Sequence, residues 1–253
     1  MKLAMFNDGI ETSGEKIYSI LMIGQSNMSG RGELSPEMQI NNPNCVMFRM
    51  GRWQKMCEPI NADRPYFGIS FPSGACLATS FADCMANHYG VKIGLIPSAD
   101  GGTCMDQWEK GTPLYDHAVF LAKLAMRTST LVGIIWHQGE SDCETVEIAK
   151  AHKQKFLNMI TSLKEDLGLP NIPVVIGELA HDYSDIRPTL ANGNPEIVNE
   201  GYHQIAKENE NFIVVSSNGL QLKADGLHFC TPALREFGVR YFEGYKQLVD
   251  KED

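Results

Sequence analysis

Ser26, His228 and Asp225 are residues whose types could cooperate in nucleophilic catalysis. A serine hydroxyl is a poor nucleophile until a base accepts its proton, and that base must be oriented by a third group, usually a carboxylate. Asp225 and His228 are three positions apart, so one turn of chain can bring the carboxylate to the imidazole. We therefore expect Ser26 to be the nucleophile, His228 the general base and Asp225 the group that orients His228.

Attack on a carbonyl group creates an oxyanion, which needs hydrogen-bond donors that are fixed in advance. The backbone N–H of Ser26 is one candidate donor. The Gly101-Gly102 pair is a second, because glycine lets the backbone approach a ligand closely. The side-chain amide of Gln138 is a third, and we expect Glu140 to fix the same loop by hydrogen bonds to backbone amides.

Structural roles are the alternatives to these chemical ones. A serine or aspartate at the start of a helix often caps it, which would account for Ser26 and Asp225. His228 could be a surface histidine ahead of a helix, and Gln138 could hold its loop in place. We prefer the catalytic interpretation because these residues fall in four polar, glycine-rich clusters, each just beyond a predicted strand.

Five short apolar runs predict the strands that position the clusters: Ile17–Ile23, Val91–Pro97, Leu131–His137, Ile172–Glu178 and Phe212–Ser217. The runs are rich in β-branched residues and nearly continuous, which is typical of strands buried on both faces. Helical patterns lie between and after them: Ala75–His88, Leu114–Ser129, Glu144–Leu167, Glu196–Asn209 and Pro232–Val249. This alternation predicts a five-stranded parallel sheet in one three-layer α/β domain that spans residues 1–253.

The four clusters occupy residues 24–28, 99–103, 137–142 and 224–228. Ligands of open parallel sheets bind outside the carboxyl ends of the strands, so we expect the clusters to meet at one edge. Residues 30–73 are too many for a plain loop, and we interpret them as an insertion over the top of the sheet. Within it, Val46–Glu58 resembles a small hairpin around Gly51.

Composition excludes several classes of function. The chain has 22 Lys and Arg against 31 Asp and Glu, a net charge of −9, and no basic run, which argues against binding to nucleic acid or to an anionic membrane. It has no run of about 18 apolar residues that could span a bilayer. The histidines do not cluster at metal spacing, so we predict no metal and no cofactor.

The seven cysteines lack a C-x-x-C spacing, and seven is an odd number. We therefore expect reduced thiols in a cytoplasmic protein, with one disulfide as an alternative. The first residues show no apolar segment of a signal peptide, which agrees with that expectation.

Four motifs carry a family resemblance: GQSNMSG at Gly24–Gly30, GLIPSADGGT followed by Trp108, WHQGESD at Trp136–Asp142, and DGLHF at Asp225–Phe229. Together they resemble the SGNH (GDSL-like) hydrolases. The nearest branch holds sialic acid-specific acetylesterases and carbohydrate esterase family 6, which includes acetylxylan esterases. The resemblance implies a flavodoxin-like sheet, the triad of Ser26, Asp225 and His228, and an oxyanion hole from the Ser26 amide, Gly101 or Gly102, and Gln138. Many members of the superfamily carry Asn at the Gln138 position, and Gln is typical of this branch.

The expected activity is removal of O-acetyl groups from carbohydrate by a serine esterase. Acetylated xylo-oligosaccharides are the favoured substrate, because an acidic surface offers little to a negatively charged sugar; O-acetyl sialate is the alternative. Candidate substrate contacts are Gln25, Trp108 and Arg31, with Trp53, Arg49 and Arg52 also considered. The alternative is that Trp108 packs beneath the second motif and that the arginines are solvated. A non-catalytic carbohydrate-binding protein on the same fold is the rival from another class. A nucleotide or flavin binder is disfavoured, since the first loop has neither phosphate-binding glycine pattern. No protein partner or oligomeric state is predicted.

Overall fold

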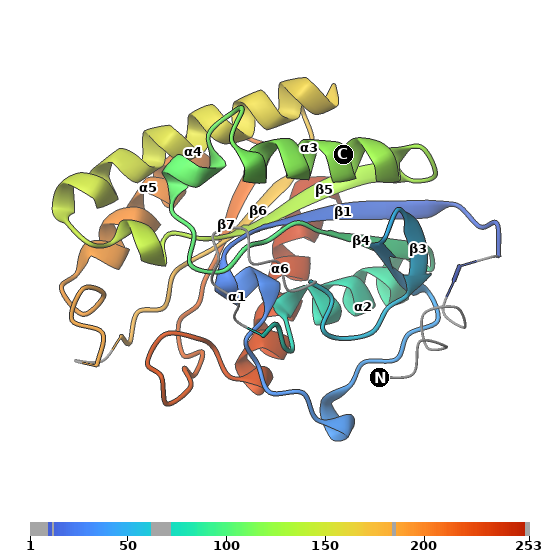
Figure 1. Cartoon of the computed structure of the whole chain (residues 1–253), viewed down its shortest axis with the longest axis horizontal. Coiled ribbons are helices and arrows are strands. Elements are labelled where there is room, and N and C mark those ends of the chain that lie inside the picture. Colours follow the sequence, from blue (N-terminus) through green and yellow to red (C-terminus); the bar gives the residue numbers. More distant parts are fainter. Residues whose placement is uncertain (1–9, 12, 62–71, 184–185, 251–253) are drawn as a thin grey trace.

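The computed structural model describes residues 10–11, 13–61, 72–183 and 186–250. Within them lies a seven-stranded sheet in the order β3-β2-β4-β1-β5-β6-β7 (Figure 1). Its strands are β1 Ile17–Gly24, β2 Cys45–Arg49, β3 Arg52–Lys55, β4 Lys92–Pro97, β5 Thr130–His137, β6 Val174–Gly177 and β7 Phe212–Val215. All neighbouring pairs are parallel except β2 and β3.

Helices cover both faces of this sheet (Figure 1). They are α1 Ser26–Ser29, α2 Leu77–Tyr89, α3 Pro113–Met126, α4 Val146–Leu167, α5 Asn194–Glu208 and α6 Thr231–Val249. Helices α2 and α6 pack together on one face, while α4 packs against α3 and α5 on the other. Short 3-10 helices in the described connections lie at Pro36–Met38, Met105–Trp108 and Glu140–Asp142.

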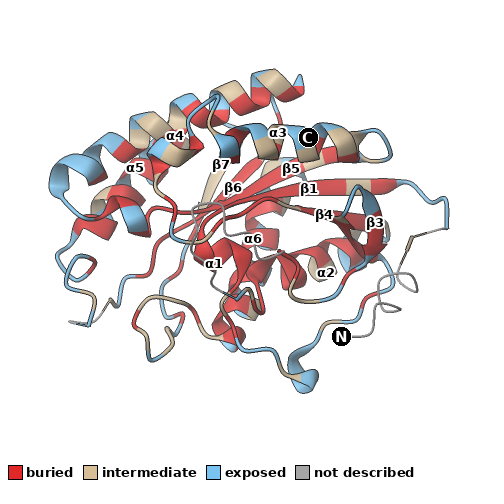
Figure 2. Cartoon of the chain, viewed as in Figure 1, coloured by how far each residue is buried: buried red, intermediate tan, exposed pale blue. Residues whose placement is uncertain are grey.

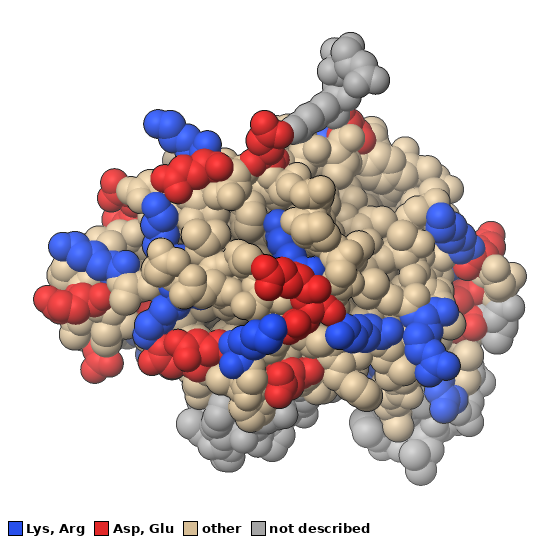
Figure 3. All heavy atoms as spheres, turned by 90° about the horizontal axis from the view of Figure 1, so that it is seen from above, with Lys and Arg blue, Asp and Glu red and all other residues tan. Residues whose placement is uncertain are grey.

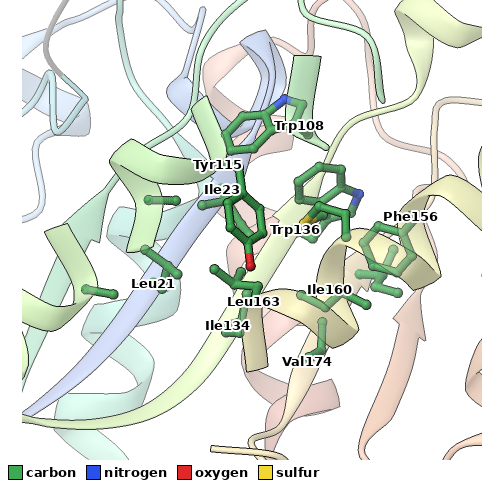
Figure 4. Close-up of a cluster of buried hydrophobic side chains, with 14 of the residues drawn as sticks. Leu21, Ile23, Trp108, Tyr115, Ile134, Trp136, Phe156, Ile160, Leu163 and Val174 are labelled. Carbon is green, nitrogen blue, oxygen red and sulfur yellow. The ribbon is translucent and has the colours of Figure 1, made fainter. Parts of the chain in front are cut away.

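The sheet separates two hydrophobic cores, because successive side chains of a strand point to opposite faces. In β1, Ile20 and Met22 belong to the core beside α2 and α6, whereas Leu21 and Ile23 belong to the core beside α3, α4 and α5. Figure 2 shows the central strands buried along most of their length. Figure 4 shows part of the second core, including Trp108 and Trp136. The near-continuous apolar runs of the sequence are explained by this burial on both faces.

The predicted α/β class is confirmed, but the predicted number of five strands is wrong. The five predicted runs form β4-β1-β5-β6-β7, which is the flavodoxin-like order 2-1-3-4-5 when these strands alone are numbered. The two further strands come from the predicted hairpin. Strand β2 pairs with the outer edge of β4, and β3 pairs with β2. The hairpin therefore extends the sheet sideways and does not lie over its top.

The segment 30–73 is only partly described, since residues 62–71 lie outside the described residues. None of the helices in the described part of the chain has the length and apolar character needed to span a bilayer.

Candidate active site

Ser26 begins α1 directly after β1 and Gln25. At the end of β1, Gly24 has φ +132°, and a Cβ there would lie 2.1 Å from the carbonyl oxygen of His137 at the end of β5. The next residue, Gln25, donates its backbone N–H to the same carbonyl oxygen at 2.9 Å. A glycine is thus required at position 24, because only the absence of a side chain allows the two strand ends to meet beside Ser26.

His228 and Asp225 lie in the connection between β7 and α6. Asp225 Oδ2 lies 2.9 Å from His228 Nδ1, while Oδ1 accepts the backbone N–H groups of Leu227 at 2.9 Å and His228 at 3.0 Å. Partial burial raises the pKa of the Asp225 carboxyl, but the hydrogen bonds from His228 and Leu227 outweigh burial and lower this pKa to about 2. The ionised carboxylate only accepts hydrogen bonds, so it keeps the proton of the imidazole on Nδ1 and leaves Nε2 as a base.

Ser26 and His228 line the same pocket, which has a volume of about 400 Å³. Its wall also contains Gln25, Arg31, Gly102, Glu140, Ser141, Arg187, Thr189, Leu190 and Leu227. The predicted nucleophile and base therefore line one pocket at the carboxyl ends of the strands, and the predicted orienting carboxylate lies against Nδ1 of the imidazole. Their catalytic roles stay predictions.

Both candidate glycines lie near Ser26. A Cβ built on Gly101 would lie 3.5 Å from Ser26 Cβ and 2.3 Å from Arg31 Nη2. Gly102 lines the pocket and has φ +75°, a left-handed backbone conformation that favours glycine. The backbone of residues 101–102 thus lies close to Ser26, and the amide of either glycine stays a candidate donor to the oxyanion.

Gln138 is fully buried, and its side chain is part of a hydrogen-bond network below the pocket. Its Nε2 donates to the carbonyl oxygen of Thr103 at 3.0 Å and to the Asp142 carboxylate, while its Oε1 lies 3.0 Å from His152 Nε2. An amide nitrogen carries two hydrogens, and both have acceptors here. In this arrangement Gln138 holds its loop, which was the structural alternative, and has no spare hydrogen for an oxyanion.

Glu140 is buried and lines the pocket. Its Oε1 accepts from Asn27 Nδ2 at 2.7 Å and lies 3.4 Å from His137 Nε2. Burial raises the pKa of this carboxyl, but His137 and Asn27 outweigh burial and leave the pKa below its usual value. Glu140 was expected to bind backbone amides; a hydrogen bond from its own backbone amide also lowers its pKa, and its other partners among the described residues are these two side chains.

Of the predicted substrate contacts, Gln25 and Arg31 line the pocket, and Trp108 does not. Trp108 is fully buried, its Nε1 donates to Thr103 Oγ1 at 3.0 Å, and its ring packs edge-on against Trp136 with 5.5 Å between ring centroids (Figure 4). The expected contact between Trp108 and a sugar is therefore wrong. A tryptophan suits both a sugar contact and a hydrophobic core, and only the packing in the structure distinguishes the two roles.

The hairpin residues that were also considered lie away from the pocket. The indole of Trp53 is buried and donates to Thr128 Oγ1, while Arg49 donates to the carbonyl oxygen of Pro59. Arg52 is exposed at the start of β3. In their place the pocket contains Arg187, which no sequence motif indicated; its Nε donates to the backbone oxygen of Asp225 at 3.0 Å.

Across the described ranges, no group of three or more His, Cys, Asp and Glu side chains is placed to hold a metal ion. All seven cysteines are free thiols.

Comparisons with known proteins agree with the motifs. A family model for carbohydrate esterases, described as sialic acid-specific acetylesterases, matches residues 16–247. A probable carbohydrate esterase of Arabidopsis thaliana is 28% identical over 244 residues, which cover 89% of this chain and 88% of the plant protein.

Solved structures resemble the fold. An Arabidopsis thaliana protein has a TM-score of 0.79 at 26% identity, covering 92% of this chain and 98% of its own. NanS has a TM-score of 0.74 at 17% identity, covering 96% and 100%. A carbohydrate acetylesterase from Xanthomonas citri has a TM-score of 0.66 at 18% identity, covering 93% of this chain and 57% of its own. With the family model matching nearly the whole chain, this protein belongs to the sialic acid-specific acetylesterase family of carbohydrate esterases, on the SGNH hydrolase fold.

Proposed function

We propose that this chain is a serine esterase that removes O-acetyl groups from carbohydrate, with Ser26 as nucleophile, His228 as general base and Asp225 as its orienting carboxylate. One observation carries the proposal. Ser26 and His228 line one pocket, and the imidazole nitrogen that would carry its fixed proton lies 2.9 Å from the Asp225 carboxylate. That division of roles is the arrangement that a serine nucleophile requires.

The reaction would proceed in two halves. Ser26 Oγ attacks the acetyl carbonyl carbon while His228 Nε2 accepts the hydroxyl proton. The tetrahedral intermediate then collapses, the C–O bond to the sugar breaks, and His228 returns the proton to the departing sugar oxygen. Water, deprotonated by His228, attacks the acetyl-Ser26 ester. The C–O bond to Ser26 then breaks, His228 returns the proton to Ser26 Oγ, and acetate leaves. Asp225 stays ionised throughout and stabilises the imidazolium.

The oxyanion would be stabilised by backbone donors. The first N–H groups of a helix have no acceptor within that helix, so the Ser26 amide at the start of α1 is suited to this role. Gly101 or Gly102 would supply a second amide from the adjacent loop. Gln138, whose two amide hydrogens are already bound, suits this role less well. Removing one such donor typically costs about 100- to 1,000-fold in rate.

The test is hydrolysis of p-nitrophenyl acetate by wild type, Ser26→Ala and a control, Ser129→Ala, whose serine lies at the other end of the sheet beside Ser19. We expect Ser26→Ala to lose at least about a thousandfold in kcat with an unchanged circular dichroism spectrum, and Ser129→Ala to keep its activity. Undiminished activity in folded Ser26→Ala would contradict the proposal. A folded wild type that hydrolyses no acetyl ester but binds acetylated glycan would favour the non-catalytic alternative.

Among sugars, we propose that an acidic one is the substrate. Arg31 and Arg187 both line it beside Ser26 and His228, and guanidinium groups bind carboxylates in a bidentate manner. The preference for neutral xylo-oligosaccharides rested on net charge, which is a property of the whole molecule. On the face in Figure 3, acidic and basic side chains are interspersed, so net charge is a poor guide to any one site. We therefore propose O-acetyl sialate as the better substrate.

The matched test compares kcat/KM on O-acetyl sialate and on acetylated xylo-oligosaccharide. Arg187→Gln should reduce kcat/KM for the acidic sugar by about 10- to 100-fold, the typical value of a hydrogen bond to a charged group, and should leave the neutral sugar within about threefold. Arg127→Gln, an exposed arginine at the end of α3, is the control. A higher kcat/KM for the xylo-oligosaccharide in the wild type would overturn the substrate assignment without touching the serine mechanism.

A further inference from the structure

Asn27 joins three separate segments of the chain through one buried side chain. Its Nδ2 donates to Glu140 Oε1 at 2.7 Å and to the backbone oxygen of Leu227 at 3.3 Å. Its Oδ1 accepts the backbone N–H of Phe229 at 3.1 Å. Two of these partners, Leu227 and Phe229, are the residues on either side of His228 in the chain.

The hydrogen bonds of the His228 backbone groups fix the shape of its loop without fixing its distance from Ser26. Asp225 Oδ1 accepts the His228 N–H, and the Lys223 N–H donates to the His228 carbonyl oxygen at 2.7 Å. Both bonds close within the loop itself. The bonds of Asn27 cross to α1 instead, and Asn27 is covalently adjacent to Ser26. They therefore tie the backbone on both sides of the base to the residue next to the nucleophile.

Glu140 determines which way the Asn27 amide faces. The ionised carboxylate can only accept a hydrogen bond, so it selects the Nδ2 end of the amide. That choice directs Oδ1 toward the N–H of Phe229. Asn27 is buried, so an amide group without a hydrogen-bond partner would be costly there. This cost disfavours other orientations of the amide.

We infer that Asn27 is a positioning residue for the esterase reaction: it sets the distance between the His228 imidazole and the Ser26 hydroxyl, and Glu140 holds it in the required orientation. The inference rests on the proposed function of Ser26 and His228. Asn27 touches no reacting atom. Its effect comes through the backbone of residues 227–229, and a displacement of about 1 Å at reacting groups can cost about a hundredfold in rate.

Asn27→Asp tests this inference with little change of shape. The new carboxylate still accepts from Phe229, but it cannot donate to Glu140 or Leu227, and it faces a second carboxylate. We expect kcat on p-nitrophenyl acetate to fall about a hundredfold while KM stays within about threefold. Labelling of Ser26 by a fluorophosphonate should slow in parallel, because it depends on the same activated hydroxyl.

The double variant Asn27→Asp with Glu140→Gln restores this hydrogen bond in the reverse direction: the amide at position 140 donates and the carboxylate at position 27 accepts. We expect it to recover kcat at least tenfold over Asn27→Asp. Asn42→Asp is the matched control: the Asn42 amide also donates to a carboxylate, Asp83, and accepts a backbone N–H, from Asn44, but it lies before β2. A folded Asn42→Asp should keep its kcat.

The outcomes separate this inference from the function on which it rests. Activity in folded Ser26→Ala means that the serine mechanism fails. An inactive Ser26→Ala together with Asn27→Asp that loses no more kcat than Asn42→Asp overturns the positioning role alone, as does a double variant that recovers nothing. If Asn27→Asp does not fold, Asn27→Ser replaces it, since it introduces no charge, and the same comparison of kcat per folded molecule decides.

Discussion

The two carboxylate oxygens of Asp225 have different hydrogen-bond partners, and this difference predicts the effect of Asp225→Asn. Oδ1 accepts two backbone N–H groups, so in Asp225→Asn the amide oxygen should take that place and the NH₂ group should face His228 Nδ1. The amide would donate where the carboxylate accepted, and the imidazole would carry its proton on Nε2. We expect kcat to fall about 10³- to 10⁴-fold, measured on p-nitrophenyl acetate, with the loop structure kept.

The control for that variant is the pH at which it is measured. Because the pKa of Asp225 is lowered to about 2, the wild-type carboxylate is ionised throughout the range from pH 5 to 8. The loss in Asp225→Asn, measured at pH 7, therefore reports the removal of a charged acceptor and not of a protonated acid. An activity close to that of wild type would show that another group orients His228, and Glu140 would then be examined first.

Residue type identified most of the pocket but could not distinguish a buried side chain from an exposed one. The positions of Ser26, His228, Gln25 and Arg31 follow from their places at strand ends, which a sequence displays. Trp108 has the right type for a sugar contact, yet it fills the core beside Trp136. Arg187 could not be found, because its place depends on how the connection after β6 folds back over the pocket.

Among the elements, the strands that alternate with helices and the hairpin around Gly51 were predictable, but the pairing of that hairpin with the edge of the sheet was not. Each of the five strands that alternate with helices is an apolar run bounded by turn residues. Strands β2 and β3 have five and four residues, and β3 reads Arg-Trp-Gln-Lys, with charged residues at both ends. Pairing of β2 with β4 rests on contacts between segments far apart in the chain, and local patterning does not encode them. Charged residues at the outer strand suit an exposed sheet edge.

The described part of the segment before α2 is fastened by an ion pair between Arg235 of α6 and Glu58. Arg235 Nη1 lies 2.8 Å from Glu58 Oε1, which also accepts the backbone N–H of Cys76 and the hydroxyl of Thr79. The Glu58 side chain is only 4% exposed. Arg235→Met would leave the charge of the buried Glu58 carboxylate without a cation. We therefore expect the free energy of unfolding to fall by about 3–5 kcal/mol in urea titration.

Lys246→Met, on the same helix, is the matched control for that ion pair. Its partner Glu243 is half exposed, and such surface pairs contribute about 0–1 kcal/mol. A loss in Arg235→Met no larger than in Lys246→Met would mean that Glu58 is adequately held by Cys76 and Thr79 alone. Both variants should keep the kcat of folded protein, because neither ion pair borders the pocket.

At the scale of the whole molecule, the fold places one buried histidine where its ionisation opposes folding. His152 is fully buried, and its Nε2 donates to Gln138 Oε1, so its Nδ1 is unprotonated. The pKa of His152 is lowered to about 3: burial is the main cause, Glu140 opposes it and Lys155 adds to it. In the unfolded chain this pKa returns to about 6.5. Between about pH 6.5 and 3, His152 is therefore protonated in the unfolded state and neutral in the folded state.

This difference makes the free energy of unfolding fall as the pH drops from 6.5 toward 3, by about 1.4 kcal/mol per pH unit and so about 2 kcal/mol at pH 5. Urea titrations at pH 7 and pH 5 measure the fall. His152→Gln, which keeps a donor for Gln138, should remove most of it, whereas His88→Gln, at an exposed histidine, should retain it. Equal slopes in wild type and His152→Gln would mean that the folded protein accommodates a proton on His152. The network below the pocket would then have to rearrange on acidification, since Nδ1 has no acceptor among the described residues.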